Sequence, residues 1–113
     1  MDNCLFCKII TVEIPSTKVY EDEYVYAFND INPVAPVHVL VIPKEHICCA
    51  DGVTEENSLY VAKVFEAIAK IAKQLDIEGK YRVVNNCGEE AGQTVFHMHF
   101  HLIAGGSFGW PPC

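Results

Sequence analysis

The stretch Phe96-His97-Met98-His99-Phe100-His101-Leu102 places a histidine at every second position. The apolar residues between them follow the same two-residue period, which is typical of a β-strand with one polar and one apolar face. The three imidazoles are therefore expected on one face of a strand over residues 96–103. At about 3.3 Å per residue His97 and His101 stand roughly 13 Å apart, whereas a Zn–N bond measures about 2.1 Å. The three rings cannot all bind one metal ion, so the strand indicates an elongated polar ligand or three histidines with different roles.

The composition is ordinary for a globular protein, and we expect one domain over residues 1–113. A net charge of −7 argues against a nucleic-acid surface, although local donors can still hold a mononucleotide. The apolar runs are too short to span a membrane, and the N-terminus does not have the pattern of a secretory signal. Six cysteines without an export signal indicate thiols or metal ligands. We therefore expect a cytoplasmic protein.

The order of the segments predicts an α+β fold. Short runs of β-branched and aromatic residues, bounded by turn residues such as Asp22-Glu23, predict five strands. The strands are expected at residues 18–21, 24–29, 37–42, 81–86 and 96–103. Because most connections are brief, these strands predict a five-stranded, mainly antiparallel meander sheet.

One short and one long helix are expected beside this sheet. The short helix covers residues 6–11 and ends near the Ile14-Pro15 step. The long helix starts at Thr54, where two following glutamates lie near the positive end of the helix dipole, and it stops before Gly79. Its apolar stripe is expected at Val61, Phe65, Ile68, Ala72 and Leu75.

The segment 97–103 matches the pattern His-φ-His-φ-His-φ-φ, in which φ is apolar. Further segments match one family in order and spacing: Phe28–Ile31, Pro36–Ile47, Gly92-Gln93-Thr94 and Trp110-Pro111-Pro112. The chain resembles the histidine triad (HIT) superfamily of nucleotide hydrolases and transferases, and it is similar to the Hint branch of purine nucleoside phosphoramidases. The resemblance implies the HIT-like fold and a nucleotidyl-histidine intermediate.

The resemblance implies catalytic roles for four residues. His99 matches the nucleophile, whose neutral imidazole attacks an α-phosphorus while a backbone carbonyl, here expected from His97, holds its other ring nitrogen. His101 matches the histidine on the leaving-group side, and histidine in place of glutamine favours hydrolysis over transfer to a sugar phosphate. His38 matches a proton partner behind the nucleophile, whereas its strand pattern alone predicts a core histidine. Thr94 stands where Hint relatives usually carry serine.

The resemblance also implies nucleotide contacts. Asp30 resembles the carboxylate that binds the ribose hydroxyls, since two acceptor oxygens suit a vicinal diol. Asn86 matches a phosphate-contacting asparagine, and Asn85 should point the other way; either residue alternatively closes a turn. Asn29 departs from the histidine often found there in Hint proteins. Candidates for the nucleobase slot, which spacing alone would place in the core, are Leu5, Phe6, Ile9, Phe28 and Ile31.

Cys4-Leu5-Phe6-Cys7 provides two cysteines at the spacing of a metal-binding knuckle. Alone it is weak evidence for a metal ion, because a tetrahedral site needs two more ligands. Two free thiols are the alternative. The pair resembles the structural zinc site of bacterial-type relatives, completed there by the histidines that match His46 and His97. The resemblance thus implies a closed Zn²⁺ site that holds the N-terminus and is not required for catalysis. No ligand role is implied for Cys48, Cys49, Cys87 and Cys113.

The function implied is hydrolysis of purine nucleoside 5′-phosphoramidates, such as an amine joined to AMP, through His99. One alternative is hydrolysis of dinucleoside polyphosphates, as in the Fhit branch. Another is a nucleotide-binding or scaffolding protein with incidental activity. The expected partners are a purine mononucleotide (AMP or GMP), its conjugates and a second copy of the chain in a homodimer, with no nucleic acid and no membrane.

Overall fold

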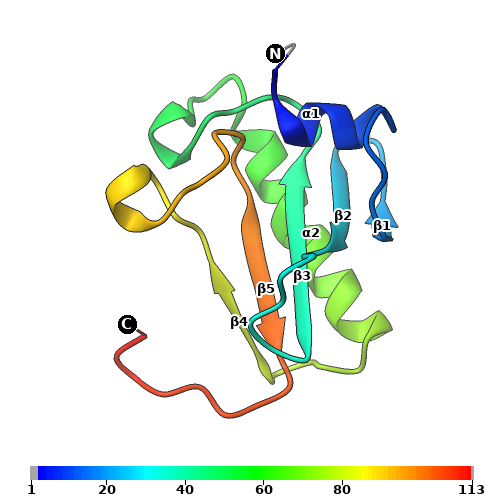
Figure 1. Ribbon diagram of the computed structural model, residues 1–113, viewed down its shortest axis with the longest axis vertical. Coiled ribbons are helices and arrows are strands. Elements are labelled where there is room, and N and C mark those ends of the chain that lie inside the picture. Colours follow the sequence, from blue (N-terminus) through cyan, green and yellow to red (C-terminus); the bar gives the residue numbers. More distant parts are fainter. Residues whose placement is uncertain (1–2, 113) are drawn as a thin grey trace.

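The computed structural model describes residues 3–112, which build a sheet in the strand order β1-β2-β3-β5-β4 (Figure 1). Every pair of neighbouring strands is antiparallel. The strands are β1 (Lys18–Glu21), β2 (Val25–Asn29), β3 (Val37–Pro43), β4 (Tyr81–Val84) and β5 (Phe100–Ala104). The α+β fold class is therefore confirmed. The structure adds that β5 lies between β3 and β4, so the last strand of the chain is not at the edge of the sheet.

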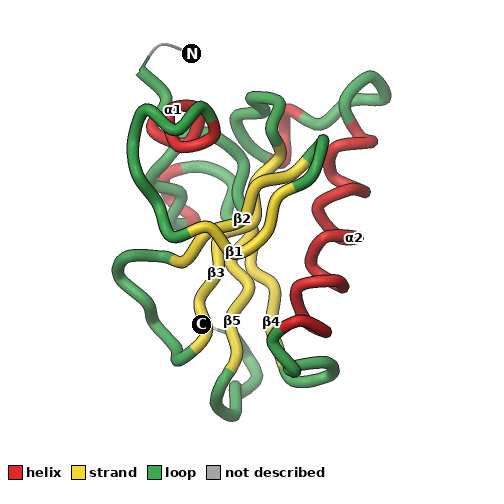
Figure 2. Tube along the Cα trace, turned by 90° about the vertical axis from the view of Figure 1, so that its right-hand side faces the viewer, coloured by secondary structure: helices red, strands yellow, loops and turns green. Residues whose placement is uncertain are grey.

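Two α-helices and two short 3-10 helices complete the fold. They are α1 (Leu5–Ile10), η1 (Ala50–Gly52), α2 (Ser58–Gln74) and η2 (Glu89–Ala91). Figure 2 shows α2 running along one side of the sheet and α1 lying at the other side. No helix among residues 3–112 has the length and apolar character needed to cross a bilayer.

The two faces of the sheet form separate cores because side chains alternate along each strand. On one face, Val39 and Val41 of β3 pack with Ile68 of α2. The other face forms a second cluster from Phe6, Ile9, Tyr26, Phe28, Leu40 and Ile42, which joins α1 to β2 and β3. Apolar side chains on both faces leave the central strands β3 and β5 buried. Polar groups on these strands must therefore find partners within the protein.

The predicted stripe of α2 was partly wrong. Ile68 and Ala72 are buried and Val61 packs against the core, whereas Phe65 and Leu75 are 49% and 36% exposed. The buried residues of the helix are Val64, Ala67, Ile68, Ile71 and Ala72. The prediction followed the four-and-three spacing that starts at Val61, but the helix presents the row beginning at Val64 to the sheet. The helix also begins at Ser58 instead of Thr54, whose carbonyl accepts from the Ser58 amide in the preceding turn (2.9 Å).

The histidine segment joins the sheet later than predicted, because β5 begins at Phe100 and not at Phe96. Its partner β4 ends at Val84 and not at Asn86, and the last paired residues are Val84 and His101. Beyond that pair the Asn85 side-chain amide donates to the His99 carbonyl (2.9 Å), where a strand neighbour's backbone would otherwise do so. The alternation nevertheless persists, since Met98 and Phe100 enter the α2-facing core and the histidines do not.

Candidate active site and metal centre

His99 is held by a backbone carbonyl, as predicted. Its Nδ1 lies 2.8 Å from the carbonyl oxygen of His97, and the ring is buried. A carbonyl can only accept a hydrogen bond, so Nδ1 carries the proton and donates it. In the neutral ring Nε2 then has a free lone pair. This is the tautomer that a nucleophilic imidazole needs.

His101 and His38 form a second hydrogen-bonded pair. The Val34 backbone N–H donates to Nδ1 of His38 (3.1 Å), which leaves the proton of the neutral ring on Nε2. That Nε2 lies 2.9 Å from Nδ1 of His101 and donates to it, so the proton of a neutral His101 resides on its own Nε2. His38 thus lies against His101, whereas the sequence placed it behind the nucleophile. Its buried position was correctly predicted.

The register of the central strands produces this pair. His38 is opposite Ile103 and His101 is opposite Leu40, so the two histidines are diagonal neighbours on one face. Burial, with further contributions from His99 and His38, lowers the pKa of His101 to about 4. In the unliganded protein His101 is therefore neutral near neutral pH and presents an N–H donor.

A cavity of about 270 Å³ opens beside His99 and His101. One wall comes from α1 and β2, and its apolar members include the buried residues Phe6, Ile9 and Phe28. These residues belong to the second core cluster and also line the cavity. The rim carries the exposed residues Asn29 and Ile31 and the half-buried carboxylate of Asp30. The shape suits a flat apolar group inside and a polar group at the mouth.

The other predicted contact residues surround the same histidines. Leu5 and Thr94 line the cavity. Asp30 lies at its rim, where Oδ1 accepts from the Asn32 backbone N–H (2.8 Å) and Oδ2 lies 3.4 Å from Nε2 of His38. Asn86 is not among the residues lining this cavity; it lines a second hollow of about 220 Å³ that includes His38 and His101. The two cavities meet at His101.

Further cavity residues were not predicted to be functional: Ile14, Pro15, Ser16, Leu40 and Val95. Ile14-Pro15 was interpreted only as a helix end, and Leu40 only as a strand residue. The sequence could have indicated Leu40, since it lies two residues after His38 and therefore on the same face of β3. The segment 14–16 carries no such signal, because its place beside α1 depends on the path of a loop.

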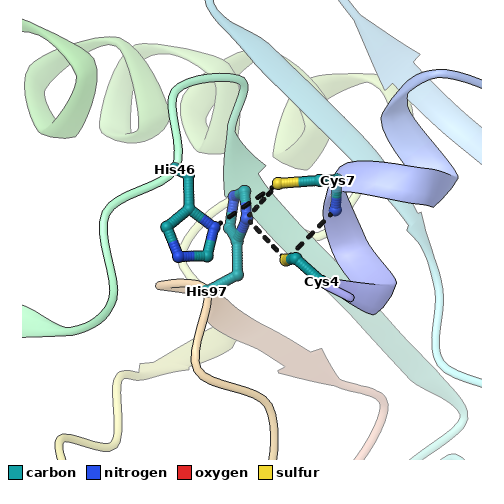
Figure 3. A group of neighbouring side chains, drawn as sticks. All are labelled: Cys4, Cys7, His46 and His97. Atoms are coloured by element: carbon teal, nitrogen blue, oxygen red, sulfur yellow. Dashed lines mark hydrogen bonds between the residues drawn. The ribbon is translucent and has the colours of Figure 1, made fainter. Parts of the chain in front are cut away.

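Cys4, Cys7, His46 and His97 converge from three separate segments of the chain (Figure 3). Nδ1 of His97 lies 3.5 Å from the sulfur atoms of both Cys4 and Cys7, and Nδ1 of His46 lies 3.4 Å from the sulfur of Cys7. Tetrahedral zinc with Zn–S near 2.3 Å and Zn–N near 2.1 Å requires S···N separations of about 3.6 Å. The four side chains therefore fit such an ion.

The protonation of this group also fits a metal. Nε2 of His97 donates to the Pro43 carbonyl (2.8 Å), which leaves the lone pair on Nδ1, the atom aimed at the two sulfurs. Burial lowers the pKa of His97 to about 4, so the ring is a neutral ligand. Burial and the adjacent Cys4 raise the pKa of Cys7 to about 11. A dication would offset this cost because it binds the thiolate form.

Residues 11–108 match the HIT domain family. The chain belongs to this family. Three relatives illustrate how closely it resembles other HIT proteins. The structure of a HIT family hydrolase from Clostridium thermocellum is 53% identical, with a TM-score of 0.93 and 96% of both chains covered. The 14 kDa zinc-binding protein of Zea mays is 48% identical over 114 residues, covering 96% of this chain and 86% of the relative.

The third relative is a histidine triad nucleotide-binding protein from Candida albicans. Its structure is 37% identical, with a TM-score of 0.82, and covers 96% of this chain and 83% of that chain. The superfamily predicted from the triad is thus confirmed, and this HIT chain spans most of each relative.

Proposed function

We propose that this HIT protein is a nucleotide hydrolase that cleaves purine nucleoside 5′-phosphoramidates through a nucleotidyl-His99 intermediate. The observation that carries the proposal is the 2.8 Å hydrogen bond from Nδ1 of His99 to the His97 carbonyl. It leaves a lone pair on Nε2 of a ring that lines the cavity. The names of the similar proteins, a HIT family hydrolase and a nucleotide-binding protein, support this reaction class.

Complementarity with the cavity supports the following position for the substrate. The purine enters the apolar slot beside Phe6 and Phe28, and the ribose hydroxyls reach the free acceptor capacity of Asp30. The phosphate then lies between His99 and His101. Asn86 approaches it from the adjoining hollow, and Thr94 lines the main cavity.

The chemistry proceeds in two steps at this phosphate. Nε2 of His99 attacks the α-phosphorus and the P–N bond breaks. His101, which takes up an additional proton when the negatively charged substrate binds, gives its Nε2 proton to the departing amine and becomes neutral. Water then attacks the phosphorus, the bond to His99 breaks, and His101 takes up the proton of that water. The enzyme returns to its starting protonation state, with the nucleoside monophosphate and a free amine as products.

The group of Cys4, Cys7, His46 and His97 is proposed to hold one structural Zn²⁺ ion. The near-tetrahedral S···N separations and the similarity to a zinc-binding protein support this assignment. When bound, the ion neutralises the two thiolates and links α1 to the loop after β3 and to the segment before β5. Four protein ligands leave no open position for a substrate, so the ion has a structural role only.

The deciding experiment compares the wild type with His99→Ala on an adenosine 5′-phosphoramidate. Release of amine should fall at least about 10³-fold, because the attacking atom is lost. Binding of AMP, measured by calorimetry, should change little. A rapidly quenched reaction with labelled substrate should give a labelled protein in the wild type only. Unchanged turnover in His99→Ala would refute the covalent route.

The same assay separates the substrate classes. A panel of phosphoramidates and dinucleoside polyphosphates should show a higher kcat/KM for the phosphoramidates. The reverse order would favour polyphosphate hydrolysis. Tight AMP binding without turnover of either class would favour a nucleotide-binding role.

A further inference from the structure

A second cluster of metal-ligating side chains lies outside the proposed active site and apart from the Cys4 group. The sulfur atoms of Cys49 and Cys87 and a carboxylate oxygen of Asp51 all lie within 4.8 Å of one another. Cys49 and Cys87 are half-buried and Asp51 is exposed, so the group is open to ions from solvent. The proposed hydrolysis uses none of these side chains.

The cluster joins two loops that the protein already holds together. Cys49 caps η1, which contains Asp51, and Cys87 precedes η2. Buried Gln93 connects these loops: its amide nitrogen donates to the Cys48 carbonyl (2.7 Å) and its oxygen accepts from the Gly88 N–H (2.8 Å). These hydrogen bonds hold the two loops beside one another, which lowers the ordering cost of binding an ion.

The chemistry of the three side chains suits a thiophilic dication. Two thiolates and one carboxylate provide three negative charges and ligand types that zinc accepts in tetrahedral sites. The hydrogen bond from the Asp51 backbone N–H lowers the pKa of Cys87. The hydrogen bond with Cys49, burial and the nearby Asp51 charge outweigh it, so the pKa of Cys87 is raised. A bound cation would remove that repulsion. A disulfide between the two cysteines would leave the carboxylate without a role.

We propose that Cys49, Asp51 and Cys87 form a second metal site that binds Zn²⁺ or Cd²⁺, with the fourth position left to solvent. The ion would bridge the loop after β3 and the loop after β4. Because Asn86 directly precedes Cys87, occupancy would also restrain the loop that carries Asn86 into the hollow beside His101.

Cys48 provides a matched control. Its sulfur lies 3.0 Å from that of Cys49, but it is not part of the group whose ligand atoms all approach one another. Cys48→Ser therefore removes a neighbouring thiol and leaves all three proposed ligands intact. Asp51→Asn has Glu90→Gln as its counterpart, because Glu90 is an exposed acid in η2 outside the cluster.

The test is a titration of the reduced, zinc-loaded protein with Cd²⁺, followed by the ultraviolet absorption of Cd–thiolate bonds and by metal analysis after gel filtration. The wild type and Cys48→Ser should bind two dications per chain. Cys87→Ser and Cys49→Ser should each bind one fewer. Asp51→Asn should weaken the second site about tenfold or more, whereas Glu90→Gln should not.

Binding at the Cys4 group is read separately. In Cys4→Ser/Cys7→Ser one dication should remain and disappear when Cys87→Ser is added, so a failure of the structural zinc assignment does not affect this result. If that variant does not fold, the loss of one dication in Cys49→Ser and in Cys87→Ser, each measured in the zinc-loaded chain, still tests the second site. The proposal is wrong if reduced wild-type protein binds no dication that is lost in Cys87→Ser. It is also wrong if Cys48→Ser removes the second ion while Cys87→Ser retains it.

Discussion

Three backbone groups determine which ring nitrogens carry protons. The carbonyls of His97 and Pro43 force Nδ1–H on His99 and Nε2–H on His97, and the Val34 N–H forces Nε2–H on His38. Rings of the same residue type thereby acquire different chemistry: one presents a lone pair to the cavity, one presents it to the cysteine sulfurs, and one donates to its neighbour. Main-chain groups thus set the tautomers of His97 and His99 directly and that of His101 through His38.

Replacement of His38 tests the pair it forms with His101. His38→Phe keeps the buried volume but removes the donor that fixes the His101 tautomer. We expect kcat for an adenosine phosphoramidate to fall about 100-fold with little change in KM, because proton delivery fails while binding persists. Steady-state kinetics measures both constants.

A double-mutant cycle supplies the control. If His38 acts through His101, His38→Phe/His101→Phe should be no slower than His101→Phe alone. Additive losses would show that His38 acts by another route.

The depressed pKa of His101 predicts an acid-sensitive fold. This pKa falls from 6.5 to about 4 in the folded protein, chiefly because of burial. As the pH decreases below 6.5, His101 of the unfolded chain binds a proton, whereas His101 of the folded chain stays neutral until the pH approaches about 4. The contribution of His101 to the free energy of unfolding is therefore constant above that pH and decreases between 6.5 and about 4.

Urea unfolding at about pH 7 and about pH 5 checks this expectation. His101→Asn should lose less stability between the two pH values than the wild type does. Other titrating groups, including the cysteine–histidine group, are common to both proteins and cancel in the comparison. Equal losses would show that His101 is not the responsible group.

The shared face of the three triad histidines was predictable from the sequence, because a two-residue period reports which side chains of a strand lie on the same face. The partner of His38 was not predictable. It depends on the register between β3 and β5, strands separated by more than half of the chain, and a shift of one residue would turn His38 to the other face. The carbonyl partner of His99 was expected from the family resemblance, and it is local in the chain, only two residues away.

At the scale of elements, α1 depends on its contacts. It has six residues, and isolated helices shorter than about 12 residues are marginal in water. Burial of Phe6 and Ile9 contributes roughly 1.5–3 kcal/mol each. Since the same residues line the cavity, the position of this helix affects both the stability of the fold and the shape of the cavity.

Removal of the proposed zinc should therefore act on binding before chemistry. In Cys4→Ser/Cys7→Ser we expect the bound metal to decrease by one ion per chain and Tm to decrease by several degrees. KM for the nucleotide should rise, because α1 is no longer held, while single-turnover cleavage at saturating substrate is largely retained. Loss of cleavage before loss of stability on addition of a chelator would indicate a catalytic metal.

The end of β5 depends on Gly105. Its φ is +103°, a conformation that other residues rarely adopt, and an added Cβ would lie 2.7 Å from Cβ of Pro36. Gly105→Ala should lower the free energy of unfolding by about 1–3 kcal/mol. Gly106→Ala has open space around the new methyl group and should change it by less than about 0.5 kcal/mol. Urea unfolding of both variants measures the difference, and equal effects would contradict the steric argument.

Element boundaries were the weakest part of the sequence prediction. The alternating pattern runs through residues 96–103, yet hydrogen bonding to β4 starts only near His101, because Asn85 satisfies the His99 carbonyl with its side chain. In α2, the four-and-three spacing indicated Phe65 as a core position, but its ring packs edge-on against Phe100 at the side of the buried stripe (centroids 5.5 Å). The periodicity of a sequence indicates which side chains share a face, whereas packing and hydrogen bonding in the folded chain decide where a strand or a buried stripe begins and ends.

At the scale of the whole molecule, the sheet has an unpaired edge. β4 is the outermost strand, so one row of its N–H and C=O groups has no strand beside it within the described chain. Beyond β5 the chain continues along this side, where Arg82 of β4 donates to the Gly109 carbonyl (2.7 Å) and Trp110 remains 85% exposed. We propose that two copies associate through this side, joining their sheets and bringing the C-terminal segments toward the partner's site.

Association should depend on ionic strength because each chain carries a net charge of −7. Sedimentation equilibrium at micromolar concentration should give about twice the chain mass of 12.6 kDa. Like-charged copies repel one another through about 10 Å of solution at 0.1 M salt and about 30 Å at 0.01 M, so the dimer should dissociate more readily at low salt. Trp110→Ala should weaken association, whereas Val12→Ala, which removes an exposed apolar side chain from the loop after α1, should not. A monomer at all salt concentrations would refute the dimer, and an unchanged dimer in Trp110→Ala would place the interface elsewhere.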